Sequence, residues 1–106
     1  MIRHLVFLRL KGSATAETRA TLQRELDGLR AHVEGMGAVE WHRNVSVEGD
    51  MTRGYTDMFE VAFRDAAARD AYLPHPEHRR VGALLVAQTD GGRDGIFVCD
   101  VEVPDA

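Results

Sequence analysis

Hydrophobic and polar residues alternate along four short segments of the chain and follow a helical period along two others. Residues 2–10, 39–45, 55–63 and 96–103 show the period of two that is typical of strands. Leu22, Leu26, Leu29 and Val33 are spaced by four, three and four residues, which places them on one stripe of a helix. We expect this helix to be capped by Thr15 and to run to about Glu34.

A proline divides the second helical region. Asp65 is suited to cap a short helix that reaches Leu73, and Pro74 cannot extend it because proline lacks an amide donor and clashes with the preceding turn. A new helix is expected from Pro76, in the favoured first position, to about Ala87. The resulting β-α-β-β-α-β order predicts an α+β, ferredoxin-like βαββαβ fold, with a four-stranded antiparallel sheet and helices on one face.

Composition is that of one globular domain over residues 1–106, with 44% hydrophobic and 28% charged residues. The net charge of −4, with both signs interspersed, argues against a nucleic-acid partner. No apolar run approaches the length of a membrane span, so no membrane partner is expected. The first residues enter a strand pattern without the apolar segment of a signal peptide, which predicts a cytoplasmic protein.

Apolar residues remain on the sheet face that two helices cannot cover. Leu5 and Phe7 must be buried there, as must one of the two apolar sets of residues 96–103. Soluble monomers rarely expose such a patch, and two sheets facing each other under twofold symmetry would bury it. We therefore predict a homodimer; a monomer with a mildly apolar sheet face is the alternative.

Several side chains that can carry chemistry are predicted to meet between the sheet and the helices. His78 shares a helix face with Val81 and Leu85, and Tyr72 approaches from the other side of the proline break. His4 and Asp57 lie on the corresponding faces of the first and third strands. These positions predict an apolar cleft for a small-molecule ligand. Its predicted substrate-binding residues are His4, Val6, Leu26, Asp57, Phe59, Val81, Leu85 and Val98.

The predicted catalytic residues are His78 and Tyr72. A neutral imidazole accepts a proton near neutral pH, and a phenol donates a hydrogen bond to a developing oxyanion. Together they suit proton abstraction next to a carbonyl, which needs no cofactor. Structural roles are the alternative, with His4 as a hydrogen-bonded core residue and His75 as a helix cap. The histidine spacings match no metal-binding motif, so no metal site is predicted.

Six short motifs are spread over nearly the whole chain: Ile2-Arg3-His4-Leu5-Val6, Arg43-Asn44-Val45-Ser46, Arg53-Gly54-Tyr55, Ala71-Tyr72, His75-Pro76-Glu77-His78 and Val98-Cys99-Asp100-Val101. In combination they resemble the stress-responsive A/B barrel (Dabb) family. The resemblance implies a dimeric α/β barrel built from two ferredoxin-like protomers. In the family's polyketide cyclases, of the olivetolic acid cyclase type, a histidine is the general base of an aldol condensation and a tyrosine supports it. The matching positions are His78 and Tyr72, and His4 matches a histidine of the first strand.

Two positions depart from those cyclases, because a pocket tyrosine aligns with Leu26 and a third-strand histidine with Asp57. The identity of the substrate therefore does not transfer. The sequence is compatible with three functions. They are a cofactor-free, cyclase- or lyase-like enzyme acting on a β-carbonyl compound, a non-catalytic stress-responsive domain that binds a ligand or stabilises proteins, and a cofactor-free monooxygenase.

Overall fold

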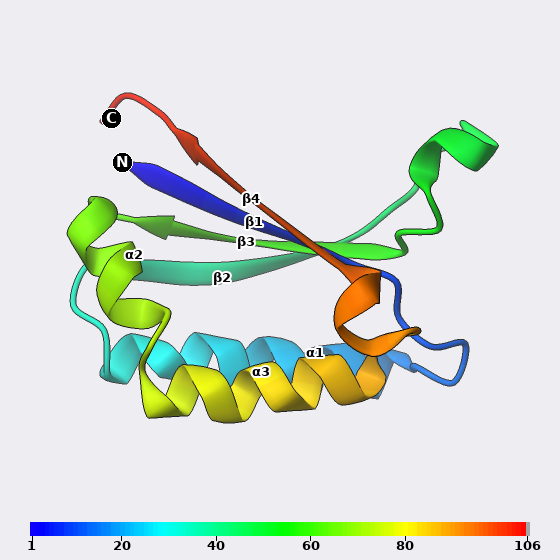
Figure 1. The fold of residues 1–106 in the computed structure, drawn as a ribbon, viewed down its shortest axis with the longest axis horizontal. Coiled ribbons are helices and arrows are strands. Elements are labelled where there is room, and N and C mark those ends of the chain that lie inside the picture. The colour runs from blue at the N-terminus through cyan, green and yellow to red at the C-terminus, as the bar shows by residue number, and fades with distance from the viewer. Residues whose placement is uncertain (106) are drawn as a thin grey trace.

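The computed structural model describes residues 1–105 and shows a four-stranded antiparallel sheet with helices on one side (Figure 1). The strands are β1 (Ile2–Leu8), β2 (Met36–Arg43), β3 (Asp57–Phe63) and β4 (Ile96–Glu102), in the spatial order β2-β3-β1-β4. β1 is central and pairs antiparallel with both β3 and β4. This order and the β-α-β-β-α-β connections confirm the predicted ferredoxin-like fold.

Two long helices, α1 (Ala16–Asp27) and α3 (Pro76–Gln88), lie side by side on one face of the sheet (Figure 1). The short helix α2 (Ala66–Tyr72) sits at one end of that layer. The core lies between the layers, where Leu22 and Leu26 of α1 and Val81 of α3 are buried with Phe59 and Val61 of β3. Burial of this kind contributes roughly 25 cal/mol per Å² of apolar surface, so the helix–sheet contact stabilises the fold.

The first helix is shorter than its hydrophobic stripe predicts. Thr15 caps it as expected, and its hydroxyl accepts a hydrogen bond from the Thr18 amide at 3.1 Å. The α-helix ends at Asp27, and a 3₁₀ turn, η1 (Gly28–Ala31), replaces its predicted last turns. Glycine at position 28 weakens the helix, because it has more backbone freedom to lose than other residues. Val33 is nevertheless buried as the stripe predicted.

The break between α2 and α3 has two side-chain caps. Asp65 accepts a hydrogen bond from the Ala68 amide at 2.9 Å and begins α2. His75 accepts one from the Glu77 amide at 3.0 Å, which confirms its predicted role as a cap. The chain thus changes direction between Tyr72 and Pro76.

The strand boundaries shift by a few residues from those predicted. β1 ends at Leu8, and Leu10 forms only an isolated bridge with Thr89. β2 begins earlier than predicted, at Met36, and its register shifts between Met36 and Val39. The alternation of faces is preserved, so the same side chains of β1 and β3 face the helices as the pattern indicated.

A tight turn leads into β4 and contains the 3₁₀ helix η3 (Gly92–Gly95). Gly95 is buried against the preceding loop, where a Cβ atom would overlap the carbonyl oxygen of Asp90. Its own carbonyl oxygen accepts a hydrogen bond from the Arg9 amide at 2.9 Å. Only glycine fits here, and this close packing holds Arg93 near Ile96, the first residue of β4.

The other face of the sheet has no helical cover (Figure 1). Phe97 and Val101 of β4 are 52% and 37% exposed on it. The connection between β2 and β3, residues 44–56 with the 3₁₀ helix η2 (Gly49–Thr52), projects away from the body of the protein. Across residues 1–105, no helix has both the length and the hydrophobicity that crossing a bilayer requires.

Candidate functional site

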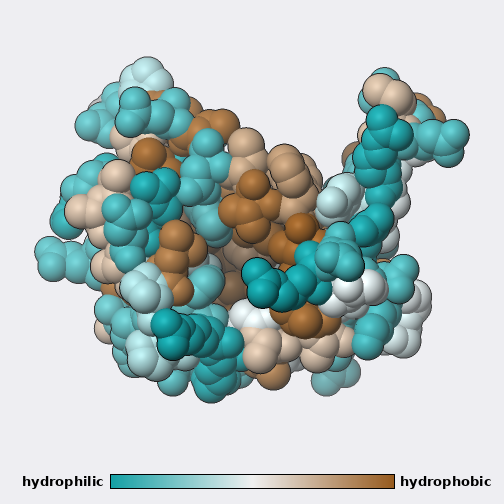
Figure 2. Space-filling model, in the orientation of Figure 1, coloured by the Kyte–Doolittle hydropathy of each residue, from teal (hydrophilic) through white to brown (hydrophobic). Residues whose placement is uncertain are grey.

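A cavity of about 330 Å³ lies between the sheet and the α2–α3 segment. Figure 2 shows an apolar hollow on the face of the molecule seen in Figure 1. The lining is mostly hydrophobic and includes two imidazoles, one phenol and one guanidinium. Its residues are His4, Val6, Phe59, Tyr72, Leu73, His78, Gly82, Leu85, Val86, Arg93, Ile96 and Val98.

A second depression, of about 360 Å³, lies between the start of α1 and the end of α3. Glu17 is its one ionisable residue, and the depression has no imidazole or phenol. The cavity beside α2 is therefore the stronger candidate site, although it is slightly smaller.

The cavity brings together most of the residues that the sequence pattern grouped. It contains the predicted His78, Tyr72, His4, Val6, Phe59, Leu85 and Val98. Leu26 and Val81 do not line it, because both are almost completely buried in the helix–sheet core. Leu73, Gly82, Val86, Arg93 and Ile96 line the cavity and were not singled out from the sequence.

Tyr72 and His78 lie side by side, with ring centroids 4.3 Å apart. The Nδ1 atom of His78 is 2.9 Å from the carbonyl oxygen of Leu73. Because a carbonyl oxygen can only accept, Nδ1 must carry the proton, and in the neutral ring the lone pair is on Nε2. Burial lowers the pKa of His78, outweighing the opposite effect of the Leu73 hydrogen bond. The ring is therefore neutral at pH 7 and able to accept a proton.

Tyr72 is 1% exposed, and its hydroxyl has no hydrogen-bond partner among residues 1–105. Burial raises the pKa of Tyr72 well above its ordinary value, so the phenol stays protonated. A buried tyrosine usually finds a partner for its hydroxyl. An unpaired donor on the wall of a cavity is suited to bind an oxygen atom of a ligand.

His4 is held by a carboxylate that was not predicted as part of the site. Its Nδ1 atom lies 2.6 Å from Oδ1 of Asp100, whose other oxygen accepts from Arg69 at 3.0 Å. Burial opposes ionisation of Asp100, but the hydrogen bonds from His4 and Arg69 outweigh it and lower the pKa of Asp100. The contact with Asp100 engages Nδ1, and the Nε2 atom of His4 has no hydrogen-bond partner among residues 1–105.

The alternation of β4 contained a signal for Asp100. This residue shares the helix-facing side of the strand with Val98, and it pairs directly with His4 in the β1–β4 register. When two strands pair, an acidic residue on an otherwise apolar face, directly opposite a histidine, indicates a histidine–carboxylate contact.

Asp57 was predicted to bind substrate, but it does not line this cavity. Its side chain is fully buried and accepts two hydrogen bonds from Arg19, at 2.7 and 3.0 Å. Trp41 Nε1 donates a third, at 2.8 Å. Burial alone would raise the pKa of Asp57, but these bonds lower it overall. Asp57 is thus an ionised anchor between α1 and the sheet.

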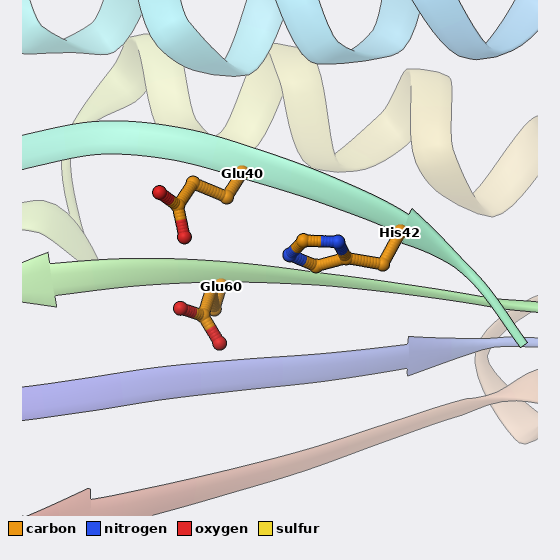
Figure 3. A group of neighbouring side chains, drawn as sticks. All are labelled: Glu40, His42 and Glu60. Atoms are coloured by element: carbon orange, nitrogen blue, oxygen red, sulfur yellow. The ribbon is translucent and has the colours of Figure 1, made fainter.

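One group of side chains among residues 1–105 has the composition and proximity of a metal site, and it lies outside the cavity. Glu40 and His42 of β2 and Glu60 of β3 gather on the open face of the sheet (Figure 3), with donor atoms within 4.8 Å of one another. The sequence spacings had suggested no such site, because the group is assembled across two strands.

Comparison with known proteins matches residues 2–103 to the Stress Responsive A/B Barrel Domain (Dabb). The stress-response A/B barrel domain-containing protein HS1 of Arabidopsis thaliana is 27% identical over 99 residues, which cover 93% of this chain and 86% of HS1. A structure from Jannaschia sp. CCS1, described as a dimeric ferredoxin-like protein of unknown function, is 36% identical, with a TM-score of 0.82, and covers 96% of this chain and 98% of its own. A hydroxynitrile lyase from Passiflora edulis shares the fold at 16% identity, with a TM-score of 0.77 and coverage of 99% and 94%.

Proposed function

Because the chain belongs to the stress-responsive A/B barrel (Dabb) family, with residues 2–103 matched, we propose that it is a cofactor-independent enzyme that transfers protons on a small carbonyl compound. One observation carries the proposal. The neutral imidazole of His78 lies beside the buried ring of Tyr72 on the wall of an apolar cavity. The Tyr72 hydroxyl has no hydrogen-bond partner among residues 1–105. General-base catalysis and oxyanion stabilisation need this pair of groups.

In the proposed reaction, Nε2 of His78 removes a proton from a carbon next to a carbonyl group. The Tyr72 hydroxyl donates a hydrogen bond to the carbonyl oxygen as it becomes an enolate oxygen. The enolate carbon then attacks a second carbonyl group of the same substrate, and a new carbon–carbon bond forms. The imidazolium returns its proton to the resulting alkoxide, which completes an aldol-type cyclisation with no net gain or loss of electrons.

His4 is proposed as a second polar group that orients the substrate. Its ring lies 5.7 Å from the Tyr72 ring, centroid to centroid, on the same cavity wall. Asp100 fixes its orientation through the bond to Nδ1. This places a second imidazole within the site without requiring it to take part in the proton transfer.

Arg93 supports a more specific proposal for the substrate. It is the cationic side chain of the cavity lining, and it forms no ion pair within residues 1–105. A free guanidinium at the rim of an apolar pocket suits a bidentate contact with a carboxylate. We propose that the substrate is largely apolar, with an anionic group that Arg93 holds at the entrance.

A homodimer is part of the proposal, supported by the description of related structures as dimeric. The exposed Phe97 and the partly buried Leu5, Phe7 and Met58 form an apolar patch on the uncovered face of the sheet. A second copy facing this patch would bury it. The projecting connection adds further apolar side chains, since Val45, Val47 and Met51 are 85%, 97% and 69% exposed.

The test compares His78→Ala and Tyr72→Phe with His32→Ala, an exposed histidine outside the cavity. Turnover of a panel of β-dicarbonyl and polyketide-like compounds should fall by about 10²–10⁴-fold in His78→Ala, the usual contribution of a general base. Tyr72→Phe should lose about 10²–10³-fold, the usual contribution of one oxyanion donor. His32→Ala should match the unaltered protein.

Full activity in His78→Ala would discard the mechanism. The relationship to a stress-response protein favours one alternative, a non-catalytic domain that binds a ligand or stabilises proteins. In that case the panel would show saturable binding in the cavity and no turnover. His78→Ala and Tyr72→Phe would then change only the affinity, and His32→Ala would bind as the unaltered protein does.

A further inference from the structure

The β2–β3 pair carries three metal-ligand side chains on the sheet face opposite the cavity. Glu40 and Glu60 are direct partners across the two strands, and His42 follows two residues along β2, on the same face. We propose that Glu40, His42 and Glu60 bind a divalent transition-metal cation of the zinc type. Figure 3 shows the three side chains gathered together, and their donor atoms lie within 4.8 Å of one another.

The charges around this group favour a cation. Two carboxylates directly opposite each other in neighbouring strands repel and destabilise the pair. Among residues 1–105, neither Glu40 nor Glu60 forms an ion pair or a side-chain hydrogen bond. Arg3 lines the same shallow hollow of about 230 Å³, but it forms no ion pair with either glutamate. Within residues 1–105, the negative charge of the two glutamates is therefore not neutralised by an ion pair, and Arg3 is the nearby positive charge in the hollow.

The geometry and the donor set match a borderline divalent cation. Zinc binds oxygen and nitrogen at about 2.0–2.2 Å, so two ligands of one ion lie at most about 4.2 Å apart. Small side-chain rotations within the group close the difference from 4.8 Å. Two carboxylates and an imidazole, without a thiolate, favour Zn²⁺, Mn²⁺ or Co²⁺ over copper(I). Three protein ligands also leave coordination positions for water.

The proposed metal site is independent of the proposed carbonyl chemistry. Glu40, His42 and Glu60 project from the uncovered face, whereas His78 and Tyr72 lie on the helix side of the sheet. A cation here would stabilise the fold, because a ligand that binds only the folded chain raises its free energy of unfolding. It would also neutralise charge on the face where the second copy is proposed to dock.

The experiment titrates the 106-residue, chelator-treated protein with ZnCl₂ by calorimetry and with CoCl₂ by visible absorption. One ion should bind per chain, with the cobalt spectrum reporting a nitrogen–oxygen site. His42→Ala and Glu60→Gln should weaken binding by at least about tenfold, because changes even outside the ligand shell have effects of that size. The matched controls His32→Ala and Glu102→Gln, exposed residues outside the group, should bind as tightly as the unaltered protein.

Arg3→Gln provides a second readout, since removing a neighbouring positive charge should tighten zinc binding. Circular dichroism checks that each variant is folded. Equal zinc affinity in His42→Ala, Glu60→Gln and the unaltered protein would overturn the proposal, because the ion would then be held elsewhere, for example by His4 or His78. Absence of any zinc-dependent heat or rise in melting temperature at millimolar zinc would overturn it as well.

Discussion

The Nδ1 atom of His4 lies 2.6 Å from Asp100, its direct partner in the β1–β4 register. The pair joins the central strand to an edge strand through side chains as well as through the backbone. It also sets the tautomer of a ring on the cavity wall, because a carboxylate on Nδ1 fixes the proton there. The same contact thus serves the sheet and the candidate site.

Asp100→Asn should lower both stability and activity. The carboxylate bonds to His4 and Arg69, and a hydrogen bond to a charged group contributes about 1.5–3 kcal/mol. We expect a loss near the lower end, because the Asp100 side chain is 25% exposed. Urea unfolding measures the loss. Asp70→Asn is the control, since Asp70 bonds to the same Arg69 but is 64% exposed, and it should change stability by less than about 0.5 kcal/mol.

Asp57→Asn should be the more severe change. It leaves the guanidinium of Arg19 without its buried partner, and breaking such a pair typically costs about 3–5 kcal/mol. Asp90→Asn, at an exposed position, is the control. Hydrogen bonds outweigh burial and lower the pKa of Asp57, so its stabilising charge is fully present above the unfolded carboxyl pKa of about 3.9 and is lost as pH falls through the folded value.

The pH dependence gives a clear check on Asp57. The difference in unfolding free energy between Asp57→Asn and the unaltered protein should be constant at neutral pH and should shrink below about pH 3.9. A difference that is independent of pH would show that the carboxylate is not ionised in the folded protein.

His78 should remain neutral to a lower pH than an exposed histidine. Burial lowers the pKa of His78, so the folded protein takes up this proton only below the ordinary value of about 6.5. The unfolded chain is protonated first, and stability should therefore decline as pH falls from about 6.5 through the folded pKa. Imidazole NMR signals measure the titration directly. In His78→Gln this part of the pH dependence should disappear; its persistence would assign the effect to another residue.

Arg93→Gln should weaken binding of apolar carboxylates. A charge-assisted hydrogen bond contributes about 1.5–3 kcal/mol, which corresponds to roughly a tenfold to hundredfold change in affinity. The same ligands with an amide in place of the carboxylate should bind both proteins equally. Arg79→Gln, exposed on α3 and outside the cavity lining, is the control and should bind normally. An equal loss of affinity for carboxylate and amide ligands would mean that Arg93 contributes to binding through the size of its side chain and not through its charge.

Phe97→Glu should shift the protein from dimer to monomer. Phe97 is 52% exposed on the uncovered face and packs beside Phe7, with ring centroids 5.8 Å apart, so a carboxylate there would be buried by a second copy. Sedimentation equilibrium measures the change. Leu84→Glu, 38% exposed on α3, is the control and should leave the assembly intact. A Phe97→Glu protein that dimerises as tightly as the unaltered one would place the interface elsewhere.

The sequence predicted the fold and the meeting of His4, Tyr72 and His78, because periodicity determines which face of an element a side chain occupies. It did not predict partners across the core. Asp57 was correctly placed on the helix-facing side of β3, but its pairing with Arg19 depends on where α1 begins relative to the sheet. Asp100 was missed for the related reason that the β1–β4 register is a tertiary feature.

The end of α1 shows a different limit. Leu29 and Val33 continue the hydrophobic stripe, and both are buried, yet the chain after Asp27 is not α-helical. Burial selects the side of the chain that faces the core, whereas the local hydrogen-bonding pattern depends on backbone entropy at Gly28. Hydrophobic spacing alone does not separate an α-helix from a following 3₁₀ turn.

The carbonyl oxygen that orients His78 belongs to Leu73, the residue before Pro74. Main-chain atoms are present whatever amino acid occupies a position. The protonation pattern of the imidazole is therefore insensitive to replacement of the Leu73 side chain, which lines the cavity. The side chains that select the ligand can therefore be replaced while Nε2 of His78 remains the proton acceptor. New substrates can be accommodated in this way without a change in the catalytic residues.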